Sequence, residues 1–446
     1  MPKKKTALTI EERLQQALVP AEEQPYEVPE NWVWVRLIGN VNSCLDGYRK
    51  PINSSERAKR VGKVPYYGAT GQVGWIDDYL TNEHLVLLGE DGAPFLDLLK
   101  DKAYIIFGEA WVNNHAHILK SYFGEIGNVF LMHYLNMVDY KDYVKGTTRL
   151  KLTQGSMQLM PFPLPPLSEQ QRIVERIEEL FAKLDEAKER LQEVADSFAV
   201  RKAAILHKAF TGELTKQWRR ENGVSDESWE EKKLGEVSFW LGGGTPSTSR
   251  EEYWENGNIL WITSKDMKSA VIEDTLMKVN EIGVKNSSAN YIEKPALLVV
   301  MRSGILRRTF PVAMVKKPFT VNQDLKAIIP DKDDLEFLYW MLLSNEQRIL
   351  DTCMKNGTTV ESINSNALKD LTFKCPTLPE QHEIVRLIDD LLARERSAQQ
   401  AAEQALASID LMKKSILARA FRGELGTNKA SEASALELLK QVLAEN

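Results

Sequence analysis

The chain has 446 residues, of which 43% are hydrophobic and 27% charged, proportions typical of a globular protein with two or three domains. The net charge of −6 does not by itself indicate a nucleic-acid-binding protein, and no apolar run approaches the roughly 20 residues of a transmembrane helix. The basic N-terminus lacks the apolar stretch of a signal peptide, and the three scattered cysteines favour a reducing compartment. We therefore expect a cytoplasmic protein with no membrane partner.

Taken in chain order, composition and hydrophobic periodicity predict six segments. Two β-rich modules alternate with two long helices, and a short helical segment lies at each end, so we expect an α+β fold with two mixed α/β modules. The segments are an N-terminal helical segment (1–31), the first module (32–163), a central helix (164–214), a linker with the second module (215–375), a distal helix (376–425) and a C-terminal helical tail (426–446).

The sequence contains an internal repeat. Residues 146–214 return as residues 357–425 without a gap, with 23 identities in 69 positions, where chance would give only a handful. The repeat includes Gly146-Thr147-Thr148 and Gly357-Thr358-Thr359, and it pairs PLSEQQRIV at 166–174 with TLPEQHEIV at 377–385. A duplicated chain predicts a molecule with pseudo-twofold symmetry.

Both repeated helices show apolar residues at the alternating spacing of four and three that is typical of a coiled coil. We expect the two helices to pack on each other antiparallel, because the small alanines in the middle of the second face bulkier residues of the first. The alternative is two separate core helices. The predicted contact residues are Ile173, Ile177, Leu180, Leu184, Leu191, Val194 and Phe198 in the first helix and Ile384, Ile388, Leu391 and Ile409 in the second, and Met412 continues the spacing. Arg201 and Glu395 interrupt it, so the contact is expected to loosen there or to cross a layer.

No catalytic constellation is evident. The glycine-rich run at 242–247 lacks the lysine of a nucleotide-binding loop, and we interpret it as a turn between strands; the alternative is a loop whose backbone amides approach a phosphate. His115 and His117 would point to one face of a strand and could bind a metal, but no third ligand lies at a telling distance, so a hydrogen-bonded structural role is favoured. The sequence therefore predicts a binding protein with no metal and no cofactor of its own.

Both modules are nearly neutral. The first has 14 Lys and Arg against 13 Asp and Glu between residues 32 and 163, and the second has 19 against 20 between residues 229 and 375. A surface that binds a polyanion must therefore be made by local clusters of cations, and the alternative for each cluster is ordinary solvated charge.

Several motifs resemble those of one known family, the specificity subunits of type I restriction–modification systems. They are the two copies of the repeat, TGEL at 211–214, YYGATGQVG at 66–74, WVNNHAHIL at 111–119, GGGTPS at 242–247 and VNQDLKAIIP at 321–330. The resemblance implies that two target-recognition domains each read half of a split sequence in double-stranded DNA. It further implies that the repeated helices form the spacer and bind two modification (methyltransferase) subunits, which carry S-adenosylmethionine, and that two motor-nuclease restriction subunits complete the enzyme.

We expect DNA contacts from polar or cationic residues in loops near glycine, where the backbone can approach DNA. These are Arg49, Lys50, Arg57, Lys59, Arg60, Thr70 and Gln72 in the first module and Thr245, Ser247, Lys265, Arg302, Arg307 and Arg308 in the second. Two other classes stay open from the residues alone: a scaffold that spaces two protein partners without reading DNA, and a hydrolase that uses the two histidines.

A rigid pair of helices between two DNA-reading modules predicts a fixed distance between the half-sites. Inserting four residues near Leu191 adds about one helical turn, roughly 6 Å. Because B-DNA advances about 3.4 Å per base pair, the unread spacer should lengthen by one or two base pairs. Sequencing the methylated sites measures the spacer, and an unchanged spacer would contradict the prediction.

Overall fold

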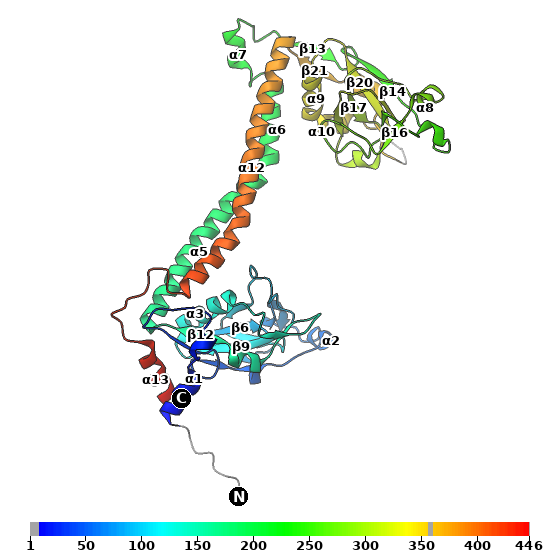
Figure 1. Cartoon of the computed structure of the whole chain (residues 1–446). Coiled ribbons are helices and arrows are strands. Elements are labelled where there is room, and N and C mark those ends of the chain that lie inside the picture. Colours follow the sequence, from blue (N-terminus) through cyan, green and yellow to red (C-terminus); the bar gives the residue numbers. More distant parts are fainter. Residues whose placement is uncertain (1–8, 356–359, 446) are drawn as a thin grey trace. The chain divides into compact units, whose positions relative to one another are not determined.

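The computed structural model describes residues 9–355 and 360–445, so Leu8 and the second glycine-threonine-threonine of the repeat, Gly357-Thr358-Thr359, lie outside the described residues. The chain divides into two compact units, one of residues 1–192 and 402–446 and the other of residues 193–401 (Figure 1). The first module lies in unit 1 and the second in unit 2. None of the helices in the described ranges is long and apolar enough to span a membrane.

The first module contains two four-stranded sheets. The larger core is built on an antiparallel sheet, whose two central strands are almost wholly buried and which helix α3 (Gly124–Met137) covers. Its order is β2 (Asn42–Cys44), β9 (Ala116–Ser121), β6 (Leu85–Gly89) and β7 (Ala103–Ile106). The other sheet has the order β4 (Gly71–Ile76), β3 (Val64–Gly68), β8 (Glu109–Val112) and β5 (Thr81–Asn82), and β3 and β8 run parallel.

The second module repeats this arrangement. Its antiparallel sheet has the order β14 (Ser238–Gly242), β20 (Leu325–Pro330), β17 (Ala296–Val300) and β18 (Val312–Val315), and helix α9 (Leu335–Ser344) packs on it. The other sheet has the order β16 (Met277–Val279), β15 (Ile259–Ile262) and β19 (Phe319–Val321), again with one parallel pair, β15 and β19. The two modules therefore share the order of the antiparallel sheet and of three strands in the other sheet, where β5 of the first module corresponds only to an isolated bridge, Ile292 to Phe319, in the second. Their interiors nevertheless hardly match in sequence.

Strand composition explains the central positions in both sheets. The runs Leu85–Gly89 and Ala296–Val300 are buried at every residue, and strands that are covered on both faces are continuously apolar rather than alternating. Short two-stranded ladders complete each module, β1 (Val33–Arg36) with β12 (Pro161–Leu164) and β13 (Glu230–Lys233) with β21 (Thr372–Cys375). Shorter elements are α1 (Ile10–Ala17), α2 (Ser54–Arg57), β10 (Val144–Lys145), β11 (Lys151–Leu152), α4 (Gln154–Leu159), α7 (Lys216–Glu221), α8 (Glu281–Lys285), α10 (Glu346–Cys353), α11 (Ser365–Lys369) and α13 (Ala435–Glu445).

The repeated helices pack antiparallel, as the sequence predicts. They are α5 (Leu167–Asp196) and α6 (Phe198–Phe210) in the first copy and α12 (Leu378–Ala420) in the second. In unit 1, Lys413 lies 2.6 Å from Asp185 and Lys188 lies 3.7 Å from Asp410, so the residue numbers rise on one helix as they fall on the other. In unit 2, α6 and the start of α12 share one apolar core.

The prediction of one continuous central helix is wrong. The central helix is interrupted at Ser197, because the carbonyl of Val194 accepts hydrogen bonds from the Ser197 hydroxyl and the Arg201 guanidinium, both at 3.1 Å, and these side chains compete with the next backbone N–H. Arg201 also pairs with Glu395, so the two charges that break the apolar spacing neutralise each other.

The apolar contact follows the predicted positions only in part. Val194 is 39% exposed and Met412 is 50% exposed, so neither lies in the contact, and Leu392 is more deeply buried than the predicted Leu391. The fully buried predicted positions are Ile173, Ile177, Ile384, Ile388 and Ile409, whereas Leu180, Leu184, Leu191, Phe198 and Leu391 are half-buried.

Each repeated helix begins with a buried carboxylate. Glu169, in the first turn of α5, accepts hydrogen bonds from the Trp32 indole and the Asn428 amide, both at 2.8 Å. Its equivalent in α12, Glu380, accepts from Thr215 and Arg219, both at 2.7 Å. In both cases donors come from the segment that follows the other helix copy, so each carboxylate fixes a chain reversal within its own unit.

We predict that Glu380→Ala lowers the free energy of unfolding of unit 2 by about 3–5 kcal/mol, because it leaves the Arg219 guanidinium, only 7% exposed, without its main counter-charge. Hydrogen exchange of the amides of α7 and of the first turns of α12 measures the local loss. The control is Glu383→Ala on the same helix, whose partner Arg386 is mostly exposed and stays hydrated, so the cost should stay below about 1 kcal/mol. Equal costs for the two variants would contradict the prediction.

Candidate nucleic-acid interface

Helix α2 and the neighbouring loops bring the predicted cations of the first module onto two aromatic rings. The Arg60 guanidinium lies 4.6 Å from the centre of the Trp111 ring, and Arg57 lies 4.9 Å from that of Tyr66. Lys50 also approaches Trp111, at 5.9 Å. We call Lys50, Arg57, Lys59 and Arg60 the basic patch. The aromatic rings fix the orientation of these cations, which suits contact with phosphate. Arg60 is also ion-paired with Asp77, at 2.6 Å.

The basic patch borders the turn between β3 and β4, which carries two further predicted residues. Thr70 and Gln72 are exposed there, and the Gln72 amide donates to the Gly74 carbonyl at 3.1 Å. Gly74 lies beneath Arg57, since a side chain on it would approach that guanidinium to 3.8 Å. Six of the seven residues predicted in the first module therefore reach its surface.

Arg49 is different, because it is enclosed. Its side chain is 16% exposed and ion-paired with Glu90 and, at 2.9 Å, with Asp46. It also donates to the Ala116 carbonyl at 3.1 Å. These bonds use most of the guanidinium donors, so Arg49 holds three chain segments together rather than facing outward, and we do not retain it as a DNA contact.

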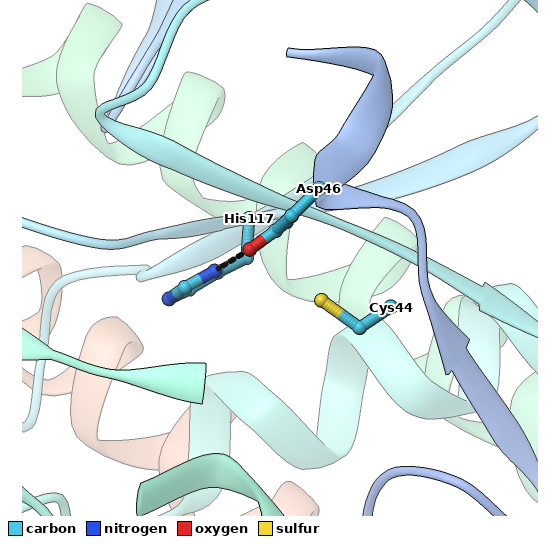
Figure 2. Close-up of side chains that lie close together, drawn as sticks. All are labelled: Cys44, Asp46 and His117. Atoms are coloured by element: carbon cyan, nitrogen blue, oxygen red, sulfur yellow. Dashed lines mark hydrogen bonds and ion pairs between the residues drawn. The ribbon is translucent and has the colours of Figure 1, made fainter. Parts of the chain in front are cut away.

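His117 belongs to the same charged cluster (Figure 2). Its Nδ1 lies 2.6 Å from the Asp46 carboxylate and its Nε2 donates to the Leu152 carbonyl at 2.9 Å. Burial alone would raise the pKa of Asp46, but the hydrogen bond and charge of His117 outweigh it and the pKa is lowered. Likewise Glu90 is buried, yet Lys151 and Arg49 lower its pKa.

Cys44, Asp46 and His117 place their donor atoms close enough to consider a metal ion. Burial, with a further effect of Asp46, raises the pKa of Cys44 to about 12, so the thiol stays protonated and is a poor ligand. Both nitrogens of His117 are already engaged, and His115 turns instead to Asp91 at 2.5 Å. The geometry supports the hydrogen-bonded structural role that the sequence favours over a metal pair.

In the second module, the glycine-rich loop after β14 is shaped by close packing. A side chain on Gly243 would lie 1.7 Å from the Val321 carbonyl oxygen, and the indoles of Trp261 and Trp254 bond the loop carbonyls of Gly244 and Ser247, both at 3.1 Å. The predicted residue Thr245 donates to the Gln323 side chain at 2.8 Å. The glycines are therefore needed for the turn, as the sequence favoured.

The predicted cations of the second module are exposed, but two of them have acidic partners. Arg302 lies 2.9 Å from Asp324, and Arg307 pairs with Glu361. Lys265 and Arg308 are exposed and form no ion pair within the described part of the chain. Ser247 bonds Ser249 at 2.8 Å. Sequence reasoning missed the aromatic supports Trp111 and Tyr66, although both lie in motifs that it quoted.

The chain contains the same kind of module twice, together with repeated helices that pack antiparallel, and the two modules have different polar loops. This arrangement is typical of a protein with two separate recognition modules. The family described as "Type I restriction modification DNA specificity domain" matches residues 29–196 and 226–405, so the chain belongs to this family.

Individual relatives agree with this assignment. The chain is 26% identical over 359 residues to a putative type I restriction enzyme specificity subunit of Haemophilus influenzae, covering 79% of this chain and 86% of the relative. It is 40% identical over 159 residues to the EcoR124I/EcoR124II specificity subunit of Escherichia coli, of whose length it covers 39%, and 35% of this chain is matched. The crystal structure of the HsdS subunit from Thermoanaerobacter tengcongensis has the same fold, with a TM-score of 0.61 at 18% identity, and the match covers 90% of this chain and 100% of that one.

The different settings of Arg49 and Arg57 predict different effects on stability. Arg49→Ala should lower the free energy of unfolding of unit 1 by about 3 kcal/mol, because Asp46 and Glu90 lose a partner in a largely enclosed site. Arg57→Ala removes a half-buried cation and its contact with the Tyr66 ring, and should lower it by no more than about 1 kcal/mol. Urea unfolding of both variants measures the difference, and an Arg49→Ala variant as stable as the unaltered chain would contradict the enclosed role.

Proposed function

We propose that this chain is the non-catalytic DNA-recognition subunit of a type I restriction–modification complex. Each module reads one half of a bipartite, asymmetric target in double-stranded DNA. The observation that carries the proposal is the shared topology of the two modules combined with unlike loop chemistry. Equal folds present their loops to DNA in the same way, and unequal side chains in those loops select different base pairs.

Phosphate contacts are assigned to the cations that reach the surface, among which Arg57 and Arg60 are half-buried. In the first module these are the basic patch, with Thr70 and Gln72 beside it. The second module contributes Thr245, Ser247, Lys265, Arg302, Arg307 and Arg308. Because each module is nearly neutral overall, binding depends on these local clusters, and Arg302 and Arg307 would exchange a carboxylate for a phosphate or a base.

The repeat supports a pair of identical partners. The two copies share the same helix and the same Gly-Glu-Leu helix end, whose glutamate is exposed in both (Glu213 and Glu424), so a partner that fits one copy fits the other. We assign these places to two methyltransferase subunits, which bind S-adenosylmethionine and take the target adenine out of the base stack. Two motor-nuclease subunits would complete the restriction enzyme. This chain supplies sequence recognition and binds no cofactor itself.

The proposal predicts a methylation pattern that depends on this chain. Methylated adenines are sequenced in genomic DNA from cells that carry the methyltransferase with or without this chain. The expected result is one bipartite motif with an unread gap of constant length, found only when the chain is present.

The alternative, a scaffold that does not read DNA, draws on the near-neutral charge of both modules. It predicts that no motif depends on the chain. Binding of the purified complex to mixed duplex DNA separates the two further, because phosphate contacts make affinity fall steeply as salt rises. Methylation without a motif, together with salt-insensitive binding, would refute the proposed function.

A further inference from the structure

One turn has the same backbone in both modules. It joins β8 to β9 in the first and β19 to β20 in the second, and thus connects the two sheets. A buried asparagine begins each turn: the Asn113 side chain accepts from the His115 N–H at 2.8 Å, and the Asn322 side chain accepts from the Asp324 N–H at 3.2 Å. The residue between the two bonded positions is therefore pushed outward. It is an exposed amide in both modules, Asn114 in the first and Gln323 in the second, and the Gln323 Oε1 also accepts from Thr245 at 2.8 Å.

A second loop is joined to this turn by one backbone hydrogen bond that occurs in both modules. The His115 carbonyl accepts from the Glu90 N–H at 2.7 Å, and the Asp324 carbonyl accepts from the Met301 N–H at 2.8 Å. The residue after each donor, Asp91 or Arg302, then lies beside the turn.

The acidic and basic residues at these equivalent positions are exchanged between the modules. In the first, Asp91 lies 2.5 Å from His115, so the loop carries the acid and the turn carries the base. In the second, Arg302 lies 2.9 Å from Asp324, so the loop carries the base and the turn carries the acid. Arg149 also approaches Asp91, at 2.9 Å.

Packing does not explain the exchange. The asparagines that shape the turn are buried and identical, whereas His115 is 39% exposed and Arg302 61% exposed. Exposed ion pairs contribute little to stability, so stability does not require either order of charges. We therefore attribute the difference between these side chains to the molecule that the turn contacts.

We propose, on the basis of the proposed function, that Asn114 and Gln323 are the equivalent base-reading residues of the two modules, each flanked by a charged pair that makes the two half-sites different. An Asn or Gln amide can donate to and accept from one adenine edge in the major groove. The flanking loop residue extends the contact: the Asp91 carboxylate suits the amino group of cytosine, and the Arg302 guanidinium suits the two acceptors of guanine. The turn is thus a specificity-determining element in each module.

Single substitutions in the intact methyltransferase complex test the proposal. Asn114→Ala should relax one base pair in one half of the methylated motif, and Gln323→Ala should relax one base pair in the other half. The expected loss of discrimination at that position is about ten- to a hundredfold. The matched controls are exposed amides away from the turns, Asn82→Ala on β5 and Gln347→Ala on α10, which should leave the motif unchanged.

An exchange variant tests the charged pair. Arg302→Asp combined with Asp324→His gives the second module the charge order of the first while an ion pair is kept, so thermal stability should hold. The expected result is a changed second half-site and an unaltered first half-site.

The outcomes separate this inference from the proposed function. If the unaltered chain directs no motif, the proposed function fails. If it directs a motif but Asn114→Ala and Gln323→Ala leave it unchanged, alter the same half, or weaken all sequences alike, this inference is overturned while the proposed function stands. An exchange variant that keeps the original second half-site overturns the role of the charged pair.

Discussion

The two buried carboxylates at the starts of the repeated helices are the constraint on which the rest depends. Glu169 and Glu380 are fully buried, and a buried carboxylate needs hydrogen-bond donors. Among the described residues, the donors to Glu380 reach Oε1, and its Oε2 has no partner. Those donors come from segments that are distant in sequence, Trp32 and Asn428 for Glu169, and Thr215 and Arg219 for Glu380. Each helix start therefore fixes where the chain after the other helix copy must return, and hence where a module begins.

The two sites also show how a repeat diverges while its task is kept. In the first, the Trp32 indole donates to Glu169. In the second, the Arg219 guanidinium donates to Glu380 instead. Trp229, which precedes β13 as Trp32 precedes β1, has no hydrogen-bond partner for its buried indole within the described residues. The Trp229 ring instead lies 6.0 Å from the Arg219 guanidinium. A charged donor replaces a neutral one, and the chain reversal is preserved.

The sequence predicted the features that depend on local pattern. The repeat, the helices and their antiparallel packing follow from spacing that a reader can count. The enclosed setting of Arg49 could not be predicted, since it depends on Glu90, which the fold brings to it. The break at Ser197 involves the local side chain of Arg201, but the pairing of that arginine with Glu395 is visible only in the fold. Likewise, Arg57 lies at the end of helix α2 and reaches the surface whereas Arg49 is enclosed, although both are cations that precede a glycine-containing segment.

The equivalence of the two modules was hidden for a related reason. Apolar strand residues can be exchanged freely as long as they stay apolar, so the interiors lose their likeness while the hydrogen-bonded order of strands remains. Only that order aligns Asn113 with Asn322. The supports beneath the turn differ too: Glu90 of the first module is replaced by Met301 in the second, so the charged cluster around His117 has no counterpart among the residues described there. A turn geometry that persists over two such different supports is held by its own asparagine and its backbone bond. The exposed residue at its tip can therefore change without loss of the fold, which is the property that a site of variable specificity requires.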